Sequence, residues 1–119
     1  MTRQEIETAV ADLNGLILQG KALEAFDKYY HESVVMQENE LPPTVGKKAN
    51  RTREEAFFAA VTEFRQAFPL KIAVGEDISM VEWKYDYTHA EWGVRNYVQI
   101  SVQEWKDGRI IREKFYYAN

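Results

Sequence analysis

The hydrophobic residues of the first thirty positions recur at helical spacing. Thr2 and Glu5 have the spacing of a capping box, in which each side chain satisfies a free backbone amide at a helix start. One apolar face follows and ends near Gly20; it is formed by Ile6, Val10, Leu13 and Ile17. A second, shorter helix carries Leu23, Phe26 and Tyr30. Both stripes are most simply interpreted as core.

The middle of the chain predicts a short strand over residues 34–38, a long loop and a third helix. Pro42 and Pro43 forbid further strand pairing, so the loop extends to about Arg51. Thr52 and Glu55 repeat the capping-box spacing. A helical stripe then continues up to Pro69 through Phe57, Val61, Phe64 and Phe68. The loop is either a surface connection or a binding loop.

The remaining residues alternate between apolar and polar, as strands do. Strands are predicted over 70–75, 80–87, 97–105 and 109–117. In the second of these, Val81, Trp83, Tyr85 and Tyr87 share one face, and the pattern leaves open which face points inward. Helices followed by consecutive strands predict one α+β domain over residues 1–119. Three helices would pack on a strongly curved, mostly antiparallel sheet, with a pocket at the open end of the resulting cone.

The last two predicted strands form a hairpin with two distinct faces. Its first strand has an aliphatic face of Val98, Ile100 and Val102, and a mixed face of Tyr97, Gln99, Ser101, Gln103 and Trp105. A three-residue turn with Gly108 in the left-handed conformation would place Gln103 opposite Ile111 and Ser101 opposite Glu113. The mixed face then also receives Ile111, Glu113, Phe115 and Tyr117, and lines a cavity. A two-residue type I′ turn at Asp107-Gly108 would instead turn Glu113 to the other face.

Composition excludes several classes of function. The formal net charge is -4 and no basic stripe is present, which argues against nucleic acid as a partner. The absence of cysteine excludes disulfides and thiolate chemistry. His31 and His89 are far apart in sequence and predict no metal site. No apolar run has membrane length and the first residues lack a signal-peptide core, so we expect a cytoplasmic protein that does not contact membranes.

Three stretches of the chain carry a resemblance to a known family. They are Ala25-Phe26-Asp27-Lys28-Tyr29-Tyr30-His31, Thr52-Arg53-Glu54-Glu55-Ala56, and Trp105-Lys106-Asp107-Gly108-Arg109-Ile110 leading into Phe115-Tyr116-Tyr117. Over nearly its whole length the chain resembles the SnoaL-like, polyketide cyclase and ketosteroid isomerase-related, members of the nuclear transport factor 2-like superfamily. The resemblance implies a cystatin-like cone and a homodimer formed through the outer sheet face of Val98, Ile100 and Val102. The superfamily hosts enzymes and binding domains, so the fold alone does not give the function.

The resemblance also implies candidate catalytic residues. Glu38 ends the first strand, where ketosteroid isomerase-like members carry their carboxylate base, and enclosure in an apolar cone would raise its pKa. Glu113 lies in mid-strand on the proposed cavity side, where Gln103 could hydrogen-bond it. Glu38 could equally be a solvated strand end, and Glu113 a satisfied member of a structural network. Ligand-binding candidates suited to a flat, mostly apolar small molecule are Tyr97, Gln99, Ser101, Trp105, Phe115 and Tyr117.

Two functions follow as expectations. The first is a cyclase or isomerase without a cofactor, in which Glu38 removes a proton alpha to a carbonyl and Glu113 orients or reprotonates the substrate. Gln103, with Ser101 or Tyr97, would stabilise the enolate oxygen. The alternative is a non-catalytic ligand-binding or dimerisation module of the same fold.

The sequence departs from other patterns of the superfamily. It lacks the paired histidines of the dehydratase type, and its Asp86, Arg95 and Asp107 are not placed to form the Asp-Arg-Asp relay of the epoxide hydrolase type. Ser101 stands at the position where the isomerase type has an acid, which weakens the case for steroid isomerase chemistry.

Overall fold

The computed structural model describes residues 1–118 and confirms the α+β cone. Within these residues, two helices precede the sheet, α1 (Arg3–Leu18) and α2 (Ala22–Tyr29), and a third follows its first two strands, α3 (Lys47–Ala60). The strands are β1 (Tyr30–Glu38), β2 (Thr44–Val45), β3 (Val61–Gly75), β4 (Ile78–His89), β5 (Gly93–Lys106) and β6 (Arg109–Tyr116). No helix in this part of the chain has the length and apolar character needed to span a bilayer.

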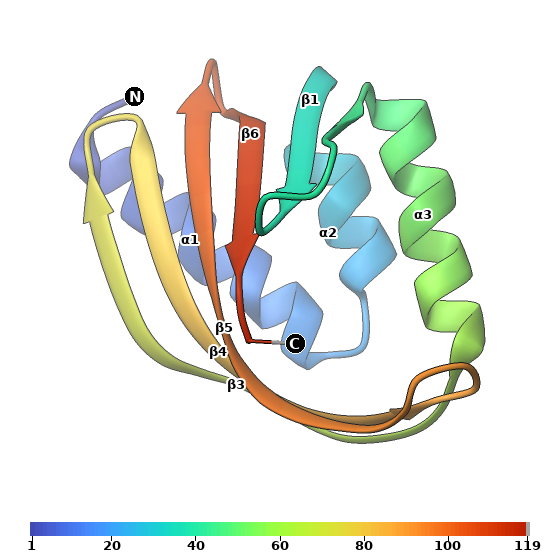
Figure 1. Cartoon of the computed structure of the whole chain (residues 1–119). Helices are drawn as coiled ribbons and strands as arrows, with labels where there is room; N and C mark the ends of the chain where they lie inside the picture. The colour runs from blue at the N-terminus through green and yellow to red at the C-terminus, as the bar shows by residue number, and fades with distance from the viewer. Residues whose placement is uncertain (119) are drawn as a thin grey trace.

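All six strands form one sheet in the order β2-β1-β6-β5-β4-β3. Neighbouring strands are antiparallel except β1 and β6, which run parallel. The long strands β3, β4 and β5 bend strongly, so that the sheet wraps around the helices and passes beneath the end of α3 (Figure 1). This curvature gives the cone its open end.

The closed end of the cone is the hydrophobic core. The predicted capping box is present, because Thr2 Oγ1 accepts from the Glu5 backbone amide at 3.2 Å and Glu5 Oε1 accepts from the Thr2 amide at 2.9 Å. The apolar stripe of α1 then packs against the sheet. Fully buried members of this core include Ile6, Val10, Leu13, Phe26, Val34, Val81, Trp83, Trp105 and Ile110.

The predicted third helix is wrong at both of its ends. α3 begins at Lys47, after Gly46 with a φ of 96°, and Thr52 lies within it, donating from its hydroxyl to the Lys48 carbonyl at 3.1 Å. The helix ends at Ala60, and Val61, Phe64 and Phe68, which continue the helical stripe, belong to β3. Because β3 is an edge strand, Pro69 can lie inside it without removing a ladder hydrogen bond on its free side.

The hairpin between β5 and β6 has the two-residue turn, so the predicted three-residue turn is wrong. Asp107 and Gly108 both have positive φ, 52° and 84°, as a type I′ turn requires. Lys106 pairs with Arg109, as this turn dictates. The register then shifts by one residue at a β-bulge.

The bulge decides which β6 side chains face the cone. Trp105 pairs with Ile110 and Gln103 with Glu113, so Ile111 is the extra residue. Glu113 therefore returns to the inner face, where it was predicted, although its partner is Gln103 and not Ser101. Ile110 is fully buried at the inner position that was predicted for Ile111.

Candidate active site

A chain of hydrogen bonds crosses four neighbouring strands at the closed end of the cone. The Trp105 indole N–H donates to Ser79 Oγ at 2.9 Å, and Ser79 Oγ donates to Gln103 Oε1 at 2.6 Å. Gln103 Nε2 donates to Glu113 Oε2 at 2.8 Å, and the Tyr30 hydroxyl donates to Glu113 Oε1. All five residues are buried. Each polar side chain thus has its partner, as burial demands.

Glu113 is the charged member of this chain. Burial raises the pKa of Glu113 from its ordinary value of 4.5 to about 7, against the hydrogen bonds from Tyr30 and Gln103, which lower it. The carboxyl therefore exchanges a proton near neutral pH, in an enclosed place. A raised pKa of this kind is common both in catalytic acids and in buried structural networks.

Glu54 brings a second carboxyl into the same interior, from α3. Burial, followed by the negative charges of Glu113 and Glu38, raises the pKa of Glu54 from 4.5 to about 7, while Arg53 lowers it. Unlike Glu113, the Glu54 carboxyl has no hydrogen-bond or ion-pair partner among residues 1–118. Part of its surface remains accessible, and its oxygens are not among the fully buried, unpartnered atoms. The Glu54 carboxyl is thus largely enclosed, has a pKa of about 7 and has no partner among residues 1–118.

Glu38, the predicted base, lies at the rim of the cone. It is the last residue of β1, and its side chain is 36% exposed. Arg53 Nη2 lies 3.0 Å from Glu38 Oε2, and the Tyr117 hydroxyl donates to Glu38 Oε1 at 3.1 Å. The role of Glu38 as a base stays a prediction.

A wall of aromatic side chains runs from the buried carboxyls toward the rim. The ring centroids of Tyr85 and Tyr97 are 5.8 Å apart, and those of Tyr97 and Tyr117 are 5.4 Å apart. Burial raises the pKa of Tyr85, and the charges of Glu113 and Glu54 raise it further, so its hydroxyl remains a donor at any physiological pH. The Tyr85 hydroxyl has no hydrogen-bond partner among residues 1–118, whereas the Tyr97 hydroxyl lies 3.0 Å from that of Tyr87.

The other predicted ligand-binding residues also lie on the inner face. Gln99 and Ser101 are buried, and the Gln99 amide donates to Ser101 Oγ at 3.2 Å. Phe115 is partly buried opposite Ser101. Trp105, however, belongs to the hydrophobic core at the closed end, where its ring lies 5.9 Å from that of Tyr29. Contact of any of these side chains with a ligand stays a prediction.

The sequence alone did not single out Glu54, and it left open whether Tyr85 faces the interior. Glu54 follows Asn50 by four residues and precedes Phe57 by three, so these three residues share the inward face of α3. Asn50 is buried and its side-chain amide donates to the carbonyls of Thr44 and Gly46 at 3.0 and 2.8 Å. The polar residues Asn50 and Glu54 on this face were the available signal for an inward-facing carboxyl. The face of a helix that packs inward is normally recognised by an apolar stripe, so this signal was not used.

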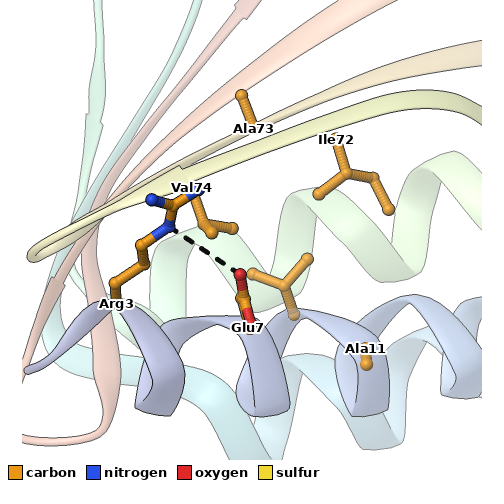
Figure 2. Close-up of a pocket in the computed structure, with 7 residues that line it drawn as sticks. Arg3, Glu7, Ala11, Ile72, Ala73 and Val74 are labelled. Atoms are coloured by element: carbon orange, nitrogen blue, oxygen red, sulfur yellow. Dashed lines mark ion pairs between the residues drawn. The ribbon is translucent and has the colours of Figure 1, made fainter.

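The two best-defined pockets lie away from the cone. One, of about 390 Å³, lies between α1 and β3, where Arg3 and Glu7 form an ion pair at 3.8 Å facing Ile72, Ala73 and Val74 (Figure 2). The other, of about 520 Å³, surrounds the amino terminus and includes Thr2, Tyr29 and Gly108. Neither contains a candidate catalytic residue. Within the described part of the chain, no group of three acidic or histidine side chains is arranged to hold a metal ion.

Comparisons with known proteins agree with the fold described above. A family model described as the SnoaL-like domain matches residues 1–117. A candidate SnoaL-like polyketide cyclase from Mesorhizobium loti superimposes with a TM-score of 0.84 at 23% identity, covering 94% of this chain and 98% of that one. A comparison with curated protein sequences found no match.

Two more distant structures share the fold. A candidate SnoaL-like polyketide cyclase from Jannaschia sp. CCS1 gives a TM-score of 0.79 at 11% identity, covering 98% of this chain and 87% of that one. An LEH-like epoxide hydrolase from Mycobacterium tuberculosis gives 0.75 at 18% identity, covering 98% and 84%. At these identities the likeness concerns the fold alone. The match of the family model over residues 1–117 goes further: the chain belongs to the SnoaL-like domain family.

Proposed function

We propose that this SnoaL-like domain catalyses proton transfer on a small carbonyl compound, as an isomerase or cyclase that needs no cofactor. The observation that carries the proposal is Glu54, an enclosed carboxyl with a pKa of about 7 and no partner among residues 1–118. A base with this pKa at neutral pH accepts a proton and returns it with similar ease. The M. loti and Jannaschia proteins are named as candidate SnoaL-like polyketide cyclases, which agrees with this proposal.

In this proposal Glu54 takes the base role that the sequence suggested for Glu38. Glu38 is already held by Arg53 and Tyr117, whereas Glu54 has no competing contact. Gln103 was the candidate for the enolate oxygen, but its amide nitrogen already donates to Glu113 and its oxygen already accepts from Ser79. We therefore assign that role to the free hydroxyl of Tyr85, which can donate to an oxyanion as charge develops on it.

Glu113 acts indirectly in this scheme. Its negative charge is one of the causes that raise the pKa of Glu54, and its two hydrogen bonds fix Tyr30 and Gln103. Two carboxyls in one interior cannot both ionise freely, so protonation of one favours ionisation of the other. Because both pKa values are about 7, the pair can accept and release a proton near neutral pH, as a proton-transfer site requires.

The test uses 2-tetralone, a flat bicyclic ketone with acidic protons alpha to its carbonyl. Proton NMR in deuterated buffer at pH 7.5 measures how fast these protons exchange, and chemical-shift titration measures binding. We expect the wild-type protein to accelerate exchange and Glu54→Gln to lower the acceleration by about a hundredfold or more, with binding retained. Glu55→Gln, the same change on an exposed neighbouring residue, should leave exchange unaffected. Acceleration that survives in Glu54→Gln but disappears in Glu38→Gln would return the base role to Glu38.

A second candidate, a ligand-binding module without catalysis, is favoured by the hydrogen-bond chain at the closed end. Every polar side chain from Trp105 to Tyr30 has its partner there, as in a network that only stabilises the fold. Under this candidate the wild-type protein binds 2-tetralone and does not accelerate exchange of its protons. The same two measurements thus separate the candidates.

We also propose that the domain forms a homodimer through its outer sheet face. Val98 is 40% exposed, Ile100 39% and Met80 42%, so apolar side chains meet solvent on adjacent strands β4 and β5. Ile100→Lys should give monomers in size-exclusion chromatography with light scattering. Val45→Lys changes an exposed valine on β2, which two strands separate from β5 in the sheet, and should leave the dimer intact. A wild-type protein that is monomeric at all concentrations would refute the proposal.

A further inference from the structure

Arg95 brings a positive charge to the inner face of the cone. It alternates with Tyr97 and Gln99 along β5 and pairs across to Tyr87 of β4. Its guanidinium carbon Cζ lies 4.8 Å from the centroid of the Tyr97 ring. Burial raises the pKa of Tyr97 and of Tyr117, and the nearby charge of Arg95 opposes the rise in both. Arg95 therefore lies beside the rim half of the aromatic wall.

Arg95 has no anionic partner among residues 1–118. Five other arginines in this range form ion pairs with carboxylates: Arg3, Arg51, Arg53, Arg65 and Arg112. The remaining one, Arg109, is exposed in the β5–β6 hairpin. Arg95, by contrast, is half-buried, and its Nε atom is fully buried without a hydrogen-bond acceptor. An N–H removed from water costs free energy until it finds an acceptor, and a guanidinium remains charged at any physiological pH.

The aromatic wall connects Arg95 with the buried carboxyls. On this wall Tyr85 lies next to Tyr97. The charges of Glu113 and Glu54 contribute to the raised pKa of the Tyr85 hydroxyl. A flat ligand lying along Tyr85 and Tyr97 would meet a carboxyl at its inner end and a guanidinium at its outer end. The three carboxyls of the cone, Glu38, Glu54 and Glu113, disfavour a doubly charged group, so a carboxylate fits better than a phosphate.

We propose that Arg95 binds a carboxylate of the ligand, so that the ligand is a flat, unsaturated carboxylic acid with its anionic group toward the rim. The assignment of the reacting end to Glu54 rests on the proposed function; the binding of the carboxylate does not. The Arg95 guanidinium would donate two parallel N–H bonds to the carboxylate, the arrangement in which arginine binds such groups most strongly. Tyr97 holds the guanidinium by the cation–π contact.

The test compares two probes of the same shape, 2-naphthoate and the neutral 2-naphthamide, by isothermal titration calorimetry at pH 8. We expect the wild-type protein to bind the carboxylate about tenfold or more tightly than the amide. Arg95→Gln should remove this preference. Arg109→Gln, which makes the same charge change at an exposed site, should retain it. Equal affinities of the wild-type protein for the two probes, or a preference that survives in Arg95→Gln, would overturn the proposal.

A measurement on the wild-type protein alone guards against a variant that is merely misfolded. The Nε–H resonance of Arg95 in a nitrogen-15 NMR spectrum should shift on addition of 2-naphthoate and not on addition of 2-naphthamide; an unchanged resonance with bound 2-naphthoate counts against Arg95. Because 2-naphthoate has no proton alpha to a ketone, this test reports binding only. Failure of Glu54→Gln to slow exchange would thus defeat the base role of Glu54 and leave the carboxylate site standing, and the converse pattern would defeat only the carboxylate site.

Discussion

Replacement of Glu54 by glutamine should stabilise the protein at alkaline pH. The pKa of Glu54 is about 7 in the folded protein and returns to its ordinary value of 4.5 on unfolding. The folded state therefore holds the proton more tightly, so the contribution of the protonated carboxyl to stability is complete below pH 4.5 and is lost as the pH rises through 7. The difference between the two pKa values corresponds to about 3 kcal/mol, at about 1.4 kcal/mol per pKa unit. Glutamine has the shape of the protonated acid and avoids this loss.

Urea unfolding followed by tryptophan fluorescence at pH 4 and at pH 8.5 measures the effect. We expect Glu54→Gln to equal the wild-type protein at pH 4 and to exceed its free energy of unfolding by about 3 kcal/mol at pH 8.5. Because Glu54 makes no hydrogen bond among residues 1–118, the substitution removes none, and the difference in unfolding free energy includes no lost contact. Glu55→Gln, at an exposed position, is the matched control and should show no gain that grows with pH. A Glu54→Gln variant no more stable than the wild-type protein at pH 8.5 would refute the placement of this carboxyl in an enclosed environment near other carboxyls.

Three further substitutions test other parts of the structure. Glu113→Ala leaves a buried hydroxyl and a buried amide without their acceptor and should lower the free energy of unfolding at pH 5 by about 3 kcal/mol; unchanged stability in urea would contradict the network. Asn39→Ala removes two hydrogen bonds, at 2.9 and 3.0 Å, to the backbone of Tyr117, and should accelerate amide hydrogen exchange at Tyr117. Gly108→Ala should destabilise by about 1 kcal/mol because φ is +84°, whereas Gly15→Ala inside α1 should stabilise by a similar amount; equal effects on thermal unfolding would argue against the type I′ turn.

The fold was predictable from the sequence where the pattern is local. The capping box at Thr2 and the alternation along β4 and β5 correspond directly to what the structure contains. The junction of α3 and β3 was not, because Phe57, Val61 and Phe64 have helical spacing and no glycine or proline marks the change at Ala60. At that junction the pairing with β4, a contact distant in sequence, overrides the local pattern.

The candidate site was predictable only for residues whose strand face could be read. Gln103 and Glu113 were placed on the inner face, and they form the centre of the buried network. Glu54 could not be found in this way, because the predicted helix began five positions after Lys47, and the apolar stripe by which that helix was recognised does not include Glu54. Its raised pKa also depends on how near Glu113 and Glu38 come in space, which no spacing along the chain encodes.

The β-bulge at Ile111 has a consequence for the order of folding. If strand pairing continues outward from the type I′ turn at Asp107-Gly108 without a bulge, Gln103 pairs with Arg112 and not with Glu113. That register forms from local contacts alone, but it turns a guanidinium toward the core and the carboxyl toward solvent, which the finished domain cannot accommodate. The bulged register instead places Glu113 on the inner face, where it accepts from the hydroxyl of Tyr30 on the neighbouring strand β1. Because this contact needs β1, we expect the hairpin to form early in the register without the bulge. The shift by one residue should follow when β1 pairs with β6.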